Sequence, residues 1–210
     1  MRDAAVHPGA EEVCDGVDND CDEATSEAGL ARWLGDDGST EDLSALFVAG
    51  APTAPAQWEG NRPGELHLCE GDYYAQLSLR DSISISGHGS PPPSISAASQ
   101  SSVVTIQGQS LEIRLENLIL KEGLGLFNSV LETAITSSGG GIACSGPNQL
   151  EIDTVTLQRN DAEWGGAIFV EECILSATDT VIRGNDGSVA GGAIVLLKAD
   201  ATFIDSELSN

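Results

Sequence analysis

The chain has 210 residues, of which 40% are hydrophobic and only 4% aromatic, and it contains 24 glycines. This composition favours short strands joined by many turns over a helical bundle, and no apolar run approaches the ~18 residues that a transmembrane helix needs. Against 33 acidic residues stand 9 basic ones, giving a formal net charge of −24 that would repel a phosphate backbone and argues against nucleic acid as a partner.

Residues 1–27 form an acidic segment whose carboxylates are spaced like metal ligands. Three aspartates alternate as at the first positions of a calcium loop, and two neighbouring side chains add oxygen atoms. Because every ligand is an oxygen, the pattern predicts a hard cation, Ca²⁺, bound weakly because the glycine and the bidentate glutamate of an EF-hand are missing. The predicted ligands are Asp15, Asp18, Asn19, Asp20 and Asp22.

The chain has five cysteines, so at least one stays unpaired if the others form bridges. Cys14 and Cys21 bracket the acidic loop, and in an oxidising compartment a bridge between them would close it. The alternatives are two thiols that bind a soft metal, or an acidic linker that is closed by the disulfide and binds no metal. The sequence leaves open the pairing of Cys69, Cys144 and Cys173.

Residues 28–60 read as a transition or linker with one apolar piece at residues 44–48. From residue 61 onward, short stretches alternate apolar and polar residues between Gly, Asn and Asp, which is typical of strands and turns. Strands of three to five residues are too short for most sandwiches but fit the faces of a β-helix coil. The expected strands include residues 66–68, 77–79, 83–86, 103–106, 111–115 and 118–120.

An internal repeat decides the predicted fold. A glycine-rich segment ending in isoleucine and an aspartate both recur at a constant interval of about 26 residues, and an asparagine recurs at an interval one residue shorter. In a parallel solenoid successive coils lie about 4.8 Å apart, so equivalent residues stack into ladders. The members are Ile142, Ile168 and Ile194; Asp153, Asp179 and Asp205; and Asn160, Asn185 and Asn210.

The sequence therefore predicts an all-β chain with a right-handed parallel β-helix, a solenoid, over residues 61–210. Each coil is expected to contain about 25–26 residues, within the range of solenoid repeats. An irregular acidic segment precedes this β-helix at the N-terminal side.

These repeats resemble a known family. Gln158-Arg159-Asn160 before Trp164-Gly165-Gly166-Ala167-Ile168, together with the next copy, is similar to the polymorphic outer membrane protein repeat, although Leu157 and Ile182 stand where that family has Phe. Residues 66–73 and 83–87 are similar to the opening coils of pectate-lyase-like β-helices. The resemblance covers about residues 61–210 and implies the fold, but not an activity, because that fold hosts lyases, adhesins and passenger domains.

The segment from Val6 to Asp22 resembles the "putative metal-binding motif" of secreted bacterial proteins, one class of which is associated with copper. This resemblance makes copper the alternative metal, with His7 as the nearby histidine. Glu23 stands where the family usually has Gly.

The repeats offer no pattern of catalytic residues. Within them no Lys or Arg recurs in register with the stacked aspartates, and no His belongs to the repeats. The coil that contains residues 121–141 is longer than its neighbours, which predicts a loop thrown out from the stack, and such loops often lie on a binding face.

The sequence therefore predicts a monomeric secreted, outer-membrane or cell-surface protein with a non-enzymatic binding, adhesion or structural role. Glycans or surface proteins are the expected partners. The alternative is a polysaccharide-active lyase or hydrolase whose catalytic coils lie partly beyond residue 210, since the last residues read as an interrupted strand pattern.

Overall fold

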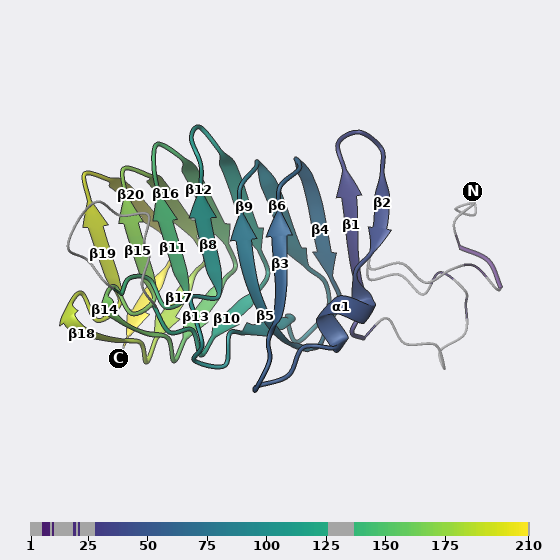
Figure 1. Cartoon of the computed structure of the whole chain (residues 1–210), viewed down its shortest axis with the longest axis horizontal. Helices are drawn as coiled ribbons and strands as arrows, with labels where there is room; N and C mark the ends of the chain where they lie inside the picture. Colours follow the sequence, from purple (N-terminus) through teal and green to yellow (C-terminus); the bar gives the residue numbers. More distant parts are fainter. Residues whose placement is uncertain are drawn as a thin grey trace.

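A computed structural model describes residues 6–8, 10, 19, 21, 28–125 and 137–209. Within these residues the protein is all-β, apart from the five-residue helix α1 (Ser44–Val48). The chain contributes strands to each sheet in turn, and we call one such round a circuit. Strands of successive circuits lie side by side in an elongated stack (Figure 1). This large, curled parallel arrangement is compatible with the predicted β-helix or a similar solenoid. In the described part of the chain, no helix is long and apolar enough to cross a membrane.

One side of the stack is an eight-stranded sheet, parallel except at its first two strands. Its central strands alternate buried and exposed residues, so one face covers the core and the other faces outward. In spatial order the strands are β2 (Thr40–Asp42), β1 (Ala31–Gly35), β4 (Gly64–Leu68), β6 (Ile83–Gly87), β9 (Glu112–Glu116), β12 (Gln149–Asp153), β16 (Ile174–Thr178) and β20 (Asp200–Ile204).

The other sides belong to an eleven-stranded sheet that turns a corner within β5 (Asp72–Leu79). The first residues of β5 pair with one arm of this sheet and its last residues with the other. One arm contains β7 (Ser94–Ser96), β10 (Ile119–Lys121), β13 (Thr156–Gln158), β17 (Val181–Arg183) and β21 (Glu207–Ser209). The other contains β3 (Ala56–Gly60), β8 (Val104–Gln107), β11 (Ile142–Ser145), β15 (Ile168–Glu171) and β19 (Ile194–Leu197), and β14 (Asp161–Trp164) pairs separately with β18 (Asp186–Ala190).

Inward-facing aliphatic side chains form rows that run along the stack. Ile142 is the register partner of Ile168, which is in turn the partner of Ile194. The first two are fully buried and Ile194 is partly buried. Because parallel pairing places like positions about 4.8 Å apart, each isoleucine packs directly on the next and removes apolar surface from water.

The glycine repeat has a steric cause. Gly165 has a φ of 65°, and a Cβ atom there would lie 2.2 Å from the carbonyl oxygen of Ile168. A Cβ on the following Gly166 would lie 2.1 Å from the carbonyl oxygen of Asp186. Only glycine combines a left-handed conformation with so close a backbone approach, which explains why the pair precedes β11, β15 and β19.

Successive circuits differ in length, whereas the strands keep their register. Along the eight-stranded sheet from β4 to β20, register partners are separated by 19, 30, 37, 25 and 26 residues in turn. An irregularity between Ala162 and Trp164 in the pairing of β14 with β18 lengthens the spacing by one residue. The asparagines Asn160 and Asn185 therefore keep an interval of 25, whereas Ile168 and Ile194, after the irregularity, are 26 apart. Ile142 and Ile168 are also 26 apart, because they precede the corner between β11 and β12 at which the interval falls to 25.

The predicted aspartate ladder is wrong at its first member. Since the step from β12 to β16 is one residue shorter than the spacing of the aspartates, Asp153 pairs with Thr178 and not with Asp179. Asp179 and Asp205 lie one position further on, at a corner where their φ angles are 47° and 49°, and Thr154 has the corresponding conformation with a φ of 54°. The recurring aspartate is thus a corner residue, of a type that tolerates the left-handed region.

Residues 28–60, which the sequence suggests as a transition, cover one end of the stack. Strand β1 pairs antiparallel with both β2 and β4. Trp33 and Phe47 are almost completely buried, and their rings contact Trp58 and Tyr73 at centroid distances of 5.5 and 5.9 Å. These aromatic contacts shield the first inward rows from water.

The long circuit lies between β10 and β11, where the sequence predicts a projecting loop. Leu124 and Ser138, on either side of that segment, form bridges to Asp161 and Trp164 of the next circuit. The centre of the segment, residues 126–136, lies outside the described residues.

Candidate functional site

The predicted metal ligands fall almost entirely outside the described residues. Only Asn19 is described: it is buried, and its carbonyl oxygen accepts a hydrogen bond from the His7 N–H at 2.8 Å. Among the described residues, no group of three or more His, Cys, Asp or Glu side chains is placed to hold a metal ion. Asp15, Asp18, Asp20 and Asp22 lie outside the described residues.

The predicted bridge between Cys14 and Cys21 is absent, because Cys21 is exposed and carries a free thiol. Cys14 itself lies outside the described residues. Cys69 takes part in a disulfide, and among the cysteines that the structure describes Cys21 alone carries a free thiol. A second disulfide joins Cys144 to Cys173 of the next circuit, with a Cα–Cα distance of 6.4 Å. The pairing that the sequence left open for these two cysteines is therefore settled in favour of a bridge.

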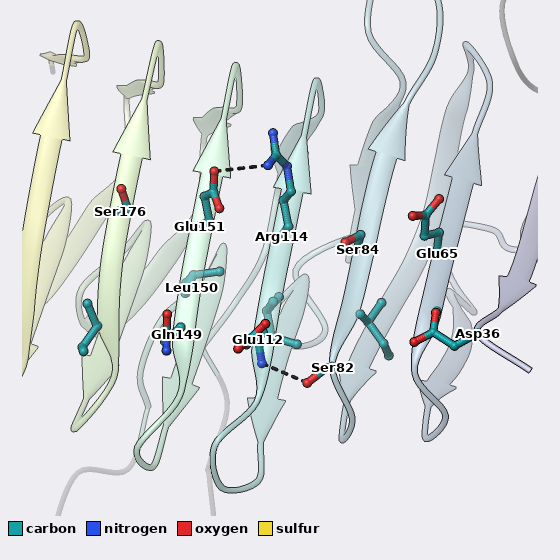
Figure 2. A pocket seen from close by; sticks show the side chains of 14 residues that line it. Asp36, Glu65, Ser82, Ser84, Glu112, Arg114, Gln149, Leu150, Glu151 and Ser176 are labelled. Atoms are coloured by element: carbon teal, nitrogen blue, oxygen red, sulfur yellow. Dashed lines mark hydrogen bonds and ion pairs between the residues drawn. The ribbon is translucent and has the colours of Figure 1, made fainter.

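A groove of about 640 Å³ crosses the outward face of the eight-stranded sheet. Figure 2 shows its side chains projecting from five neighbouring strands, β4, β6, β9, β12 and β16. They form two rows, because outward positions recur every second residue along each strand. We call Glu65, Ser84, Arg114, Glu151 and Ser176 the first row, whose members are successive register partners, and Ser82, Glu112, Gln149 and Ile174 the second row.

Arg114 stands in the middle of the first row and contacts three carboxylates. Its guanidinium lies 3.3 Å from Glu116, 3.4 Å from Glu151 and 3.8 Å from Asp153. All four side chains are partly exposed, so each pair contributes at most about 1 kcal/mol to stability. The cluster holds the guanidinium upright at the groove and balances part of the surrounding negative charge.

Two histidines lie beside the groove on the same face of the stack. The rings of His67 and His88 are nearly parallel, with centroids 5.0 Å apart and 3.0 Å between Nδ1 of His67 and Nε2 of His88. Nε2 of His67 lies 3.1 Å from Oε2 of Glu65. If His67 donates from Nε2 to the carboxylate, its Nδ1 accepts from His88, which gives a linear relay. The contacts use opposite sides of one imidazole, so these groups do not converge on a single cation.

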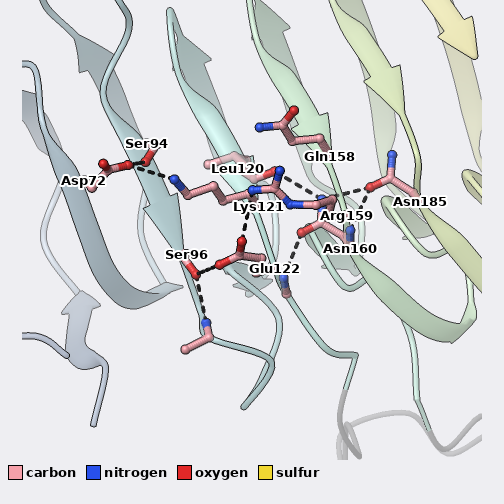
Figure 3. A network of polar contacts seen from close by, with 12 residues as sticks. Asp72, Ser94, Ser96, Leu120, Lys121, Glu122, Gln158, Arg159, Asn160 and Asn185 are labelled. Carbon is pink, nitrogen blue, oxygen red and sulfur yellow. Dashed lines mark hydrogen bonds and ion pairs between the residues drawn. The ribbon is translucent and has the colours of Figure 1, made fainter. Parts of the chain in front are cut away.

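The asparagine column satisfies buried backbone groups. Nδ2 of Asn160 donates to Oδ1 of Asn185 at 3.0 Å, and the Asn160 N–H donates to the same oxygen. Oδ1 of Asn160 accepts from the Gly123 N–H at 2.9 Å, and Nδ2 of Asn185 donates to the Leu157 carbonyl oxygen (Figure 3). Asn210 lies outside the described residues. Asn160 and Asn185, the two described members of this column, thus have a structural role.

A second polar network covers the neighbouring corner (Figure 3). Nζ of Lys121 lies 2.7 Å from Asp72, which also accepts a hydrogen bond from the Ser94 hydroxyl. The hydrogen bond from Lys121, followed by that from Ser94, holds the pKa of the Asp72 carboxyl below its usual range. Glu122 accepts from Ser96 and from Arg159 at 2.8 and 2.9 Å. These contacts link four successive circuits, from β5 to the end of β13.

Sequence reasoning missed both the groove and the histidine pair. Glu65, Ser84, Arg114 and Glu151 are separated by 19, 30 and 37 residues, so no constant period connects them. Only the register of the strands shows that these residues form one row.

Comparisons with known proteins bear on the N-terminal segment alone. Residues 2–27 match the Cu-binding_MopE family, whose description is "Putative metal-binding motif". The searches of curated proteins and of solved structures found no match. Over residues 2–27 the chain is therefore similar to a metal-binding motif, and this similarity does not identify the metal.

Proposed function

We propose that this chain is a secreted or cell-surface right-handed parallel β-helix protein that binds a glycan or a surface protein without chemical conversion. The observation that carries the proposal is the groove across β4, β6, β9, β12 and β16. Its walls come from strands whose backbones are fixed by continuous parallel pairing, so the site is preformed and little ordering is needed on binding.

The disulfides support a location outside the cytoplasm. The disulfide between Cys144 and Cys173 and the one that contains Cys69 belong to oxidising compartments, because cytosolic thiols are kept reduced. The net charge of −24 suits a soluble protein with little affinity for other acidic polymers.

A glycan array probed with the full chain tests the binding role. Gln149→Trp places a large side chain in the middle of the groove, whereas Gln107→Trp adds the same group on the outward side of β8, outside the groove. We expect binding to be lost in the first variant and kept in the second. Equal binding by both variants would show that the groove is not the site.

We further propose that residues 15–22 bind a cation, Ca²⁺ or alternatively copper. The match of residues 2–27 to a metal-binding motif and the oxygen-rich sequence support this role. Calorimetric titration of the full chain with Ca²⁺ should give a Kd of about 10⁻⁴–10⁻³ M, as in other extracellular modules. The double variant Asp18→Asn, Asp20→Asn should lose this binding, while Asp200→Asn, Asp205→Asn, with the same loss of charge, should not. Tight binding of Cu²⁺ would favour copper, and no heat with either ion would exclude the site.

An enzymatic alternative rests on the Arg114 cluster. Carboxylates and a cation gathered on one outward face are the groups that polysaccharide lyases and hydrolases use. Prolonged incubation with neutral and uronic-acid polysaccharides, followed by assays for new reducing ends and for unsaturated products, tests it. Activity that disappears in Arg114→Gln and Glu151→Gln, but not in Thr202→Ala, would replace the binding role by catalysis.

A further inference from the structure

Two of the three histidines of the chain lie against each other beside the eight-stranded sheet. His67 belongs to β4, and His88 directly follows β6, the neighbouring strand. The His88 N–H donates to the Leu68 carbonyl oxygen at 2.7 Å, so the parallel pairing of the two strands continues as far as His88. The sheet therefore holds the backbone of both histidines in place, although they are 21 residues apart in the sequence.

The distance between the two rings fits a pair of ligands on one cation. Nδ1 of His67 and Nε2 of His88 are 3.0 Å apart, and the angle between the ring planes is 9°. Since Zn²⁺ binds imidazole nitrogen at about 2.0–2.1 Å, two such ligands at an angle of about 90–110° have their nitrogens about 2.9–3.4 Å apart. A small rotation of the rings is therefore enough to direct both lone pairs at one ion.

A carboxylate orients His67 for this role. Glu65 lies two positions earlier on β4, hence on the same face of the sheet, and its Oε2 is 3.1 Å from Nε2 of His67. An ionised carboxylate only accepts hydrogen bonds, so the neutral ring carries its proton on Nε2 and its lone pair on Nδ1, toward His88. Histidines that bind metals donate their second nitrogen to a carboxylate or carbonyl in this way, which fixes the tautomer and strengthens the ligand. Glu65 is thus a positioning residue.

The pair is accessible to a hydrated ion and favours a particular kind of cation. The side chain of His67 is 21% exposed, so water can complete the coordination, as it does at zinc sites with an open position. Imidazole nitrogen suits Zn²⁺ and related ions, whereas Ca²⁺ takes oxygen ligands. The net charge of −24 also raises the local concentration of cations.

We propose that Nδ1 of His67 and Nε2 of His88 bind one divalent cation of the zinc type, with water at the remaining positions. In the metal-free pair His88 donates from Nε2 to His67, and on binding it takes the tautomer with its proton on Nδ1, so both ligands stay neutral. The site has two protein ligands only, in keeping with the finding that the described residues form no larger group of metal ligands. It is separate from the cation site proposed at residues 15–22 and does not depend on the groove.

Calorimetric titration of the full chain with Zn²⁺ tests the site. His67→Gln and His88→Gln each remove one nitrogen ligand and should each abolish binding there. Glu65→Gln leaves both ligands in place but removes the carboxylate behind His67, and it should weaken binding by about 10–100-fold. His7→Gln is the matched control, because it removes the third histidine of the chain and should leave the affinity unchanged.

Nitrogen NMR spectra of the ¹⁵N-labelled wild-type chain give a second measurement, which does not depend on how the variants fold. Zn²⁺ should shift the signals of Nδ1 of His67 and Nε2 of His88, and this shift supports the site whether or not His7 also responds. A shift confined to His7, no shift of any imidazole signal, or zinc binding that is undiminished in both glutamine variants of the pair would overturn the proposal.

One further variant separates this site from the acidic segment. Asp18→Asn, Asp20→Asn should lose the cation proposed at residues 15–22 and keep zinc at the histidine pair. Loss of all zinc binding in this double variant, with full binding in His67→Gln, would place the ion in the acidic segment and overturn the histidine site. Loss of zinc in His67→Gln with no cation bound at residues 15–22 would leave the histidine site standing and overturn only the other.

Discussion

The side-chain amide of Asn160 donates to that of Asn185 in the next circuit, and both are buried at a corner of the stack. We predict that Asn185→Ala lowers the free energy of unfolding by about 1–3 kcal/mol, because the Asn160 N–H loses its acceptor and the Leu157 carbonyl loses its donor. Urea denaturation measures the change. Asn61→Ala, at an exposed position, is the control and should leave the midpoint unchanged.

The disulfide between Cys144 and Cys173 closes a loop of sequence separation 29. Removing it with Cys144→Ala, Cys173→Ala should destabilise the protein by about 2–5 kcal/mol, mainly because the unfolded chain gains freedom. Thermal unfolding under non-reducing conditions is the measurement. Cys21→Ser, which removes a free and exposed thiol, should not shift the melting temperature, and a comparable shift in both variants would contradict the assignment.

Gly165 and Gly184 separate backbone strain from steric overlap. Both have left-handed φ angles, 65° and 56°. A Cβ atom added at Gly165 would clash with the Ile168 carbonyl oxygen, whereas a Cβ atom added at Gly184 would have no other atom within 4 Å beyond its chain neighbours. Alanine at Gly184 should cost about 1–2 kcal/mol, the penalty of the left-handed conformation alone. Alanine at Gly165 should cost clearly more. Equal losses in chemical denaturation would mean that the carbonyl of Ile168 moves aside.

The pair formed by Asp72 and Lys121 should make stability depend on pH. Because the pKa of Asp72 is lowered in the folded protein, its contribution is present above the pKa of the unfolded chain and is lost as the pH falls through the folded value. Asp72→Asn should therefore destabilise the protein at neutral pH, and the difference from the wild type should shrink below pH ~4. Asp200→Asn serves as the exposed control, and a difference that persisted unchanged into acid would contradict the linkage.

The sequence anticipated the parts of the fold that repeat. The ladder of Ile142, Ile168 and Ile194 follows from a spacing that stays constant over three circuits. The aspartate ladder failed because a spacing in sequence counts the corners as well as the strands, and one corner is a residue shorter. In the first circuits the register partners are separated by 19, 30 and 37 residues, so they share no common period. The sequence therefore could not predict the Arg114 cluster or the contact between His67 and His88.

The first end of the stack was not anticipated for a different reason. Trp33 and Phe47 lie in short elements, and their aromatic partners, Trp58 and Tyr73, belong to other strands, so the local sequence does not show these contacts. Antiparallel pairing of β1 with β4 interrupts the repeat there. Such capping segments differ from the repeat they cover, because they must present a polar outer face.

The unequal circuits have a consequence for how such a protein can change. Since strand register is kept while the connecting corners vary from circuit to circuit, insertions and deletions are absorbed locally and the side chains of every strand keep their faces. An inserted residue within β9 or β12 would instead turn alternate side chains from the core to the surface. The length of the connections and the chemistry of the surface can therefore change independently. New segments could be inserted between β10 and β11, and the outward side chains of the eight-stranded sheet could be substituted one at a time.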